Sequence, residues 1–188
     1  SAIDLLTLSG HKLHAPKGVG ALFIRKGITF TPFIVGGHQE KNRRGGTENV
    51  PSIIGLGRAC ELAKKYMREE QILVKQLRDK VEDEILEKAP DVRVNGHKTK
   101  RLPNTTNLSF EFVEGEAILL LLNERGICAS SGSACTSGSL EPSHVLRAMG
   151  VPFTAVHGSV RLSLSRYNTI EEVDYIVEHL PPIIRRLR

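Results

Sequence analysis

One helical pattern, between Asn49 and residue 88, constrains this fold more than any other feature of the sequence. Asn49 is suited to cap a helix and Pro51 to occupy its first turn. Apolar residues then recur at helical spacing and predict one apolar stripe: Ile53, Leu56, Cys60, Ala63, Met67, Leu73, Leu77, Val81 and Ile85. A helix of this length is where a chain passes from one domain to another. Cys60 is expected to be a buried, small apolar residue of the stripe.

Two short apolar runs, residues 3–8 and 19–24, precede the helix and predict strands of a buried sheet. Between them lies Lys12, with Ser9 and His11 within three residues and turn-forming Gly10, Pro16 and Gly18 around it. A lysine that loses its proton can form a Schiff base with a carbonyl, and the hydroxyl and imidazole could hold an anionic group such as phosphate. The alternative is an ordinary loop.

Residues 28–47 follow these runs and carry less regular signals. Because Pro32 lacks a backbone N–H, the apolar run 28–35 is predicted to be an edge strand or an extended loop. A glycine-rich polar segment follows and ends in Gly45, Gly46 and Thr47. Its glycines allow backbone amides to face an anion, and Thr47 adds a hydroxyl donor. The same pattern also fits a surface loop.

After Pro90 the pattern changes to short elements that indicate a small α+β domain. Residues 92–94 and 104–113 predict strands, with a turn at Asn95 and Gly96 between them. A helix over 115–123, a short strand over 126–129, a helix from Glu141 to Met149 and a strand over 158–165 follow. Thr169 is predicted to cap the last helix, which has glutamates in its first turn and arginines at its end.

Cysteine chemistry points to residues 130–139, which contain five serines, one threonine, two glycines, one alanine and Cys135. These residues cannot build a core, so we expect a mobile loop in which Cys135 is accessible and reactive. Cys128 follows Ile127 in the predicted short strand and is expected to be a core thiol; a Cys128–Cys135 metal pair matches no standard ligand spacing. Three cysteines without framework spacing favour a reducing compartment.

Arg161 is a lone charge between Val160 and Leu162 in a predicted strand. It either faces solvent or faces inward to bind a carboxylate through two parallel hydrogen bonds.

Charge and hydropathy exclude some classes of partner. The net charge is +5, and its densest run, Lys41 to Arg44, lacks interleaved aromatic residues, so we expect no direct nucleic-acid binding. No apolar run is long enough to cross a bilayer and no signal pattern opens the chain, which leads us to expect a cytoplasmic protein. Because the sequence opens on Ser1 almost directly into a strand, we expect a fragment or one piece of a larger assembly.

Three motifs, in this order, carry a close resemblance to a known family. Ser9-Gly10-His11-Lys12 with Pro16-Lys17-Gly18-Val19-Gly20 resembles the cofactor-lysine segment of NifS/IscS-type cysteine desulfurases. Gly45 to Pro51 resembles their phosphate segment, and Ser130 to Leu146 resembles their cysteine loop. These enzymes are class V aminotransferase-like proteins of PLP (pyridoxal 5'-phosphate) fold type I. The resemblance covers the whole chain and about the C-terminal half of the family.

The resemblance implies an α/β fold: the end of the large-domain sheet plus a small C-terminal α+β domain. Residues 1–50 would complete the PLP-binding large domain, 51–90 the connecting helix, and 91–188 the small domain with a cysteine loop at 130–140. Lys12 would carry PLP, with Ser9, Gly10, His11 and Thr47 as cofactor-binding residues and Thr47 contributed by the neighbouring subunit of a homodimer.

The implied reaction removes sulfur from L-cysteine to give L-alanine and a persulfide on Cys135, while Arg161 binds the substrate carboxylate. The sulfur would pass to an iron–sulfur scaffold protein of the IscU/NifU type, with Cys135 as a transient iron–sulfur ligand, or to a sulfur relay for tRNA thiolation. No intrinsic metal site is implied.

The family's aspartate that protonates the pyridine nitrogen, its ring-stacking histidine and its substrate-contacting asparagine belong to the N-terminal half, which this chain lacks. The 188 residues alone are therefore expected to bind PLP poorly unless a second polypeptide supplies that half. One alternative is a truncated half that serves as a sulfur carrier or partner-binding module. Selenocysteine lyase fits less well because of the long serine-rich loop.

Overall fold

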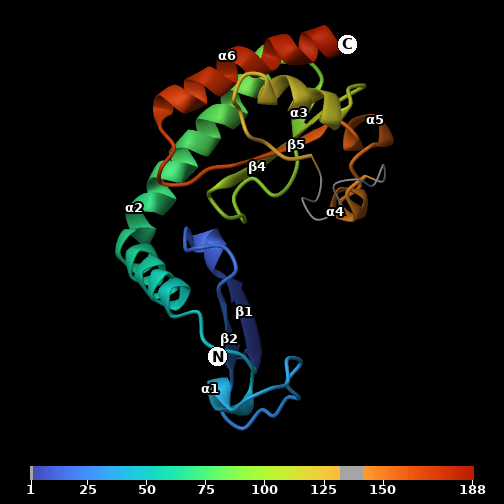
Figure 1. The fold of residues 1–188 in the computed structure, drawn as a ribbon. Coiled ribbons are helices and arrows are strands. Elements are labelled where there is room, and N and C mark those ends of the chain that lie inside the picture. Colours follow the sequence, from blue (N-terminus) through green and yellow to red (C-terminus); the bar gives the residue numbers. More distant parts are fainter. Residues whose placement is uncertain (1, 132–141) are drawn as a thin grey trace. The chain divides into compact units, whose positions relative to one another are not determined.

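The structure is a computed structural model that describes residues 2–131 and 142–188 (Figure 1). The chain forms two compact units, Ser1–Met67 and Arg68–Arg188, and the division falls inside helix α2 (Val50–Lys88). The assignment of residues 1–50 and 91–188 to a large and a small domain stays a prediction.

The first unit contains a two-stranded antiparallel sheet. Strands β1 (Leu5–Ser9) and β2 (Gly20–Ile24) pair from Leu5 opposite Ile24 to Ser9 opposite Gly20, and the short 3₁₀ helix η1 (Gly10–Leu13) follows β1. Both predicted strands are confirmed.

The predicted burial of this sheet is wrong for this chain, because large apolar side chains of both strands are 45–50% exposed: Leu5, Leu6, Leu22 and Phe23. Successive strand residues point to opposite faces, so a sheet that is apolar on both faces needs a covering layer on each. The described part of the first unit supplies neither layer.

The segment between β2 and α2 is irregular. Residues 28–35 form no strand, which favours the extended-loop alternative over the edge strand. The four-residue α1 (Gln39–Asn42) is not a regular helix, since Glu40, Lys41 and Asn42 all have positive φ. Such backbone is rare for residues with a side chain, which explains why no periodic pattern marked this segment.

Helix α2 confirms the long helical prediction, and its predicted cap is present: Asn49 Oδ1 accepts a hydrogen bond from the Ser52 N–H at 3.3 Å. The stripe is buried at Leu77, Val81 and Ile85. Toward the N-terminal end of the helix only Leu56 and Ala59 are buried, whereas Cys60 is exposed. The prediction of a buried Cys60 is therefore wrong, because its neighbour Ala59 takes the packing position.

The second unit combines a small sheet with helices. Its antiparallel sheet has the order β3 (Val92–Val94), β4 (Thr105–Phe110), β5 (Ser159–Ser163). The helices are α3 (Gly115–Asn123), α4 (His144–Ala148), the unpredicted one-turn α5 (Phe153–Val156), and α6 (Ile170–Leu187), which Thr169 and Glu172 cap reciprocally as a capping box.

Residues 126–129 do not form the predicted strand, and only Ser130 makes an isolated bridge, to Arg161. Ile127 turns inward to the core while Cys128 is exposed. The prediction of Cys128 as a core thiol is therefore wrong. An apolar pair in a short run cannot tell which of its two residues faces inward.

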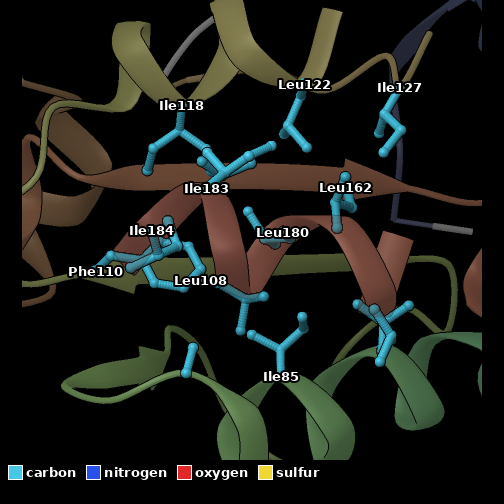
Figure 2. Packing of buried hydrophobic residues seen from close by; sticks show 14 of the residues in the cluster. Ile85, Leu108, Phe110, Ile118, Leu122, Ile127, Leu162, Leu180, Ile183 and Ile184 are labelled. Carbon is cyan, nitrogen blue, oxygen red and sulfur yellow. The ribbon is translucent and has the colours of Figure 1, made fainter. Parts of the chain in front are cut away.

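One face of the sheet packs against α2, α3 and α6 to form the core of this unit (Figure 2). Leu108 and Phe110 of β4, together with Val160 and Leu162 of β5, supply the sheet side of this core. In Figure 2, Ile118 and Leu122 reach in from α3 and Ile85 from α2, with Leu180, Ile183 and Ile184 of α6 in the same interior. The opposite face of the sheet is thereby left for polar residues.

A buried arginine in α2 anchors the loop before β4. Arg78 is almost fully buried, donates hydrogen bonds to Asp79 and to the Leu102 carbonyl at 3.2 Å, and lies 4.0 Å from Glu82. Glu82 in turn accepts a bond from Arg101. Burial raises the pKa of Asp79, but hydrogen bonds from Lys75 and Arg78 outweigh it, so that the pKa lies below its ordinary value of 3.8.

We expect the folded chain to lose stability in acid partly through Asp79. A lowered folded pKa means that the unfolded state binds the proton first, so the contribution is complete above pH 3.8 and disappears as pH falls through the folded pKa. Because Asp79 is partly exposed, we expect its contribution to the free energy of unfolding to be about 0.5 kcal/mol. Urea unfolding of the wild type, Asp79→Asn and Lys75→Gln from pH 7 to pH 3 measures it. The free energy of unfolding of the two variants should fall less between pH 7 and pH 3 than that of the wild type. An equal fall for all three proteins would contradict this role of Asp79.

Candidate active site

The predicted cofactor lysine lies in the turn that follows β1. The Gly10 N–H donates to the Val19 carbonyl at 2.8 Å, and the Ala15 N–H donates to the Gly10 carbonyl at 3.1 Å. His14 ends η1 in the left-handed region, with φ of 63°. These two hydrogen bonds thus fix the backbone on either side of Lys12.

Side chains that flank Lys12 anchor this turn on α2. Leu13, Ala15 and Val19 pack with Leu56 and Ala59 of the helix. Gly10 is buried, and a Cβ there would lie 2.8 Å from the Val19 carbonyl oxygen, so this close approach requires glycine. The packing holds the backbone of the turn and leaves the Lys12 side chain exposed.

Ser9, His11 and Lys12 present their side chains on the exposed side of this turn. Within the described part of the chain, no hydrogen bond engages these three side chains. An amine, a hydroxyl and an imidazole without partners among the described residues are groups that can bind a ligand with a carbonyl and an anionic group. The structure thus brings Ser9, Gly10, His11 and Lys12 into one turn, as their adjacency in the sequence requires.

Thr47 lies on a separate glycine-rich segment of the same unit. The buried Gly45 donates to the Ile34 carbonyl at 2.9 Å, and Gly46 has φ of 101°, a conformation that favours glycine. Thr47 is exposed two residues before the Asn49 cap of α2. No hydrogen bond of the described residues joins it to the Lys12 turn, and its contact with a phosphate in a neighbouring subunit stays a prediction.

Arg161 lies in the middle of β5 in the second unit. Its backbone pairs with Asn107 of β4 on one side and exchanges two hydrogen bonds with Ser130 on the other, at 2.7 and 3.1 Å. Val160 and Leu162 face the core, so Arg161 belongs to the opposite face, where it is half-buried. Among the residues that the structure describes, none pairs with its guanidinium.

Cys135, the predicted sulfur-bearing thiol, lies outside the described residues, as does most of the predicted loop 130–140. The two described cysteines, Cys60 and Cys128, are both free and exposed. Across residues 2–131 and 142–188, no group of three or more His, Cys, Asp or Glu side chains is arranged to hold a metal ion. In the same ranges, no helix has both the length and the apolar character to span a membrane.

The sequence interpretation missed two asparagines on the Arg161 face of the sheet. Asn95 is only 7% exposed and donates from Nδ2 to Asn107 Oδ1 at 2.6 Å and to Ser109 Oγ at 2.7 Å. The signal was present, because polar Thr105, Asn107 and Ser109 occupy every second position of β4. It could not be assigned to Arg161 before the register of β4 and β5 was known.

Comparison with known proteins gives a consistent result. The model of the family described as "Aminotransferase class-V" matches residues 1–176. "Cysteine desulfurase 2" of Trichormus variabilis is 62% identical over 188 residues, and "Cysteine desulfurase NifS" of Azotobacter vinelandii is 61% identical over the same length. Each match covers 100% of this chain and 47% of the relative.

Solved structures agree with these relatives. A structure titled "NIFS-LIKE PROTEIN" superposes with a TM-score of 0.88 at 37% identity and covers 99% of this chain and 47% of the other. A NifS-like protein from Rickettsia africae gives 0.87 at 36% identity, with 97% and 48% covered. The chain thus spans about half the length of the relatives it matches, and which half it represents stays the prediction made from its motifs.

Proposed function

This chain belongs to the class V aminotransferase family, and from that premise we propose that it forms about half of a PLP-dependent cysteine desulfurase. The observation that carries the proposal is the identity of about 60%, over the entire chain, to proteins named cysteine desulfurase. The structural neighbours confirm the predicted α/β fold of the NifS-like class V type.

The residues of the Lys12 turn fit PLP, the cofactor of this family. PLP combines an aldehyde with a phosphate, and the exposed side of the turn combines the Lys12 amine with the hydroxyl of Ser9 and the imidazole of His11. Gly10 keeps the turn tight against Val19. Lys12 would hold the aldehyde end, and Ser9, His11 and a Thr47 from a second subunit would hold the anionic part. When bound, PLP supplies an electron-withdrawing ring that stabilises charge at the substrate α carbon.

Lys12 and Arg161 would handle the substrate L-cysteine. Arg161 binds the carboxylate through its guanidinium fork, which is free of partners among the described residues. Lys12 Nζ would take the proton from the α carbon, and the packing of the turn against α2 fixes the backbone that carries it. Arg161 would therefore orient the substrate and Lys12 would move its proton.

Cys135 would take the sulfur. Its thiolate attacks the substrate sulfur, a sulfur–sulfur bond forms as the carbon–sulfur bond breaks, and the β carbon gains a proton. L-Cysteine and the thiol thus become L-alanine and a persulfide on Cys135, with the sulfur oxidised and the carbon reduced. The hydrogen bonds between Ser130 and Arg161 tie the described end of the segment that leads to Cys135 to the strand that carries Arg161.

The complete enzyme would be a cytoplasmic homodimer that passes its sulfur to an iron–sulfur scaffold protein or to a sulfur relay. Of the three cysteines in this chain, Cys60 and Cys128 are exposed and free, which suits a reducing compartment. The half of the relatives' length that this chain does not cover would complete the PLP site.

The test is the stoichiometry of the reaction in the full-length protein that carries this sequence. The PLP-loaded protein should release one L-alanine per persulfide in the first turnover with L-cysteine, measured by amino-acid analysis and by mass spectrometry of the intact protein. Release of pyruvate and free sulfide without protein-bound sulfur would overturn the assignment as a desulfurase.

A further inference from the structure

The sheet face that carries Arg161 holds a small polar network. Asn107 lies directly opposite Arg161 on β4, and Ser109 lies two residues further along the same strand. Asn95 follows β3 and donates its backbone N–H to the Asn107 carbonyl at 2.8 Å. Leu108 and Val160, their neighbours in the strands, face the core, so Asn107 and Arg161 share the opposite face. Opposed residues of an antiparallel pair have Cβ atoms about 5 Å apart.

Asn95 fixes the side chain of Asn107. It is nine-tenths buried, and its Nδ2 donates both of its hydrogens, one to Asn107 Oδ1 and one to Ser109 Oγ. Its own Oδ1 is buried without a partner among the described residues. Turning the Asn95 amide over would bury two unpaired hydrogens in place of one unpaired oxygen, which is the costlier arrangement.

This orientation leaves Asn107 as a donor. Its Oδ1 is occupied by Asn95, so its Nδ2 hydrogens are the remaining polar atoms of the side chain. In the described part of the chain no other bond engages them, and both Asn107 and Arg161 are half-buried. The guanidinium also has donors only. Two adjacent donor groups without an acceptor select an anion, and a planar carboxylate can accept from both.

We propose that Asn107 is a second carboxylate-binding group beside Arg161, and that Asn95 is the positioning residue that holds it in its donor orientation. The proposal rests on the proposed function, since it deepens the recognition of an amino-acid carboxylate by Arg161. The carboxylate accepts from the guanidinium with one or both oxygens and from Asn107 Nδ2. Asn95 itself is buried and does not touch the ligand.

The test compares two probes that differ at the carboxylate, L-alanine and L-alaninamide. Calorimetric titration of the full-length, PLP-loaded protein should show a preference for L-alanine. Asn107→Ala should lower this preference roughly tenfold and leave the L-alaninamide affinity within about twofold, because one hydrogen bond to a charged group is lost. Asn107→Asp keeps the shape of the side chain but places a negative charge beside the carboxylate of L-alanine. The repulsion between the two should lower the preference for L-alanine roughly a hundredfold.

Thr105→Val is the matched control. Thr105 lies two residues from Asn107 on the same face of β4, opposite Ser163, so its substitution should leave the preference unchanged. A general effect of substitutions on this face would lower the preference in Thr105→Val as well, and that result would overturn the specific role of Asn107.

A double-mutant cycle tests the positioning role of Asn95. Asn95→Ala should lower the L-alanine preference about threefold in the wild type and not at all in Asn107→Ala, because it acts through Asn107. An equal loss in both backgrounds would overturn that role.

Arg161→Ala separates this inference from the proposed function. If Arg161→Ala removes the preference while Asn107→Ala and Asn107→Asp keep it, the inference fails and the carboxylate role of Arg161 stands. If Arg161→Ala keeps the preference, the carboxylate site itself is wrongly placed. If circular dichroism shows that Asn107→Ala folds poorly, the L-alanine preference of the isosteric Asn107→Asp alone tests the role of Asn107.

Discussion

Lys12→Ala in the full-length protein should lower the rate of alanine formation from L-cysteine by at least about a thousandfold, the scale of losing a positioned base that also anchors the cofactor. The visible absorbance of covalently held PLP should disappear as well. The turn itself should persist, because Leu13, Ala15 and Val19 hold it against α2 and the Lys12 side chain is exposed. Absorbance spectra and amino-acid analysis on the same sample measure both effects.

Lys17→Ala is the matched control for Lys12. Lys17 is an exposed lysine of the same β1–β2 connection, five positions along, and it has no role in the proposed site. It should retain the PLP absorbance and a rate within about twofold of the wild type, as surface substitutions usually do. If Lys17→Ala lost the absorbance and Lys12→Ala kept it, the cofactor lysine would be misassigned.

Local patterns in the sequence predicted most of the elements. Helix α3 begins at Gly115 and ends at Asn123 as predicted, and α2 keeps its cap at Asn49. Such elements depend on periodicity and on end residues that are contiguous in the sequence. The turn around Lys12 was predictable for the same reason, because its glycines, its proline and its chemically active side chains lie within a dozen residues.

Burial was harder to predict than secondary structure. Cys60 and Cys128 both lie in apolar surroundings in the sequence, yet Ala59 and Ile127 occupy the packed positions beside them. The direction of a side chain in a short run depends on partners that are distant in the sequence. The apolar strands β1 and β2 are exposed for a related reason: nothing in the described part of the first unit packs over their faces.

The Arg161 site shows most clearly what a sequence leaves open. The neighbours Val160 and Leu162 were compatible with an arginine in solvent and with an arginine that binds a carboxylate. The register that places Asn107 opposite Arg161 connects residues more than fifty positions apart, and Asn95, which holds Asn107, lies on a different strand end twelve positions before it. Pairing across such a separation is a property of the folded sheet, so the local sequence around Arg161 does not contain it.

Cys135→Ala should abolish the protein-bound persulfide and lower alanine formation by at least about a thousandfold, because no other group of the proposed site can accept the sulfur. The PLP absorbance should remain, since Cys135 has no part in holding the cofactor. This separation of cofactor binding from sulfur transfer is the expected signature of a thiol that acts only on the substrate. Intact-protein mass spectrometry after one turnover, with and without a reductant, detects the added sulfur.

Cys60→Ala and Cys128→Ala provide controls that the structure makes especially strict. Both thiols are free and exposed in the described chain, so each could attack the L-cysteine sulfur in place of Cys135, with cleavage of the same carbon–sulfur bond, if persulfide formation depended on accessibility alone. Each single variant should nevertheless form the persulfide at the wild-type rate, and the double variant should carry it on Cys135. A persulfide that disappears in Cys128→Ala and persists in Cys135→Ala would transfer the role to Cys128, seven residues earlier in the chain.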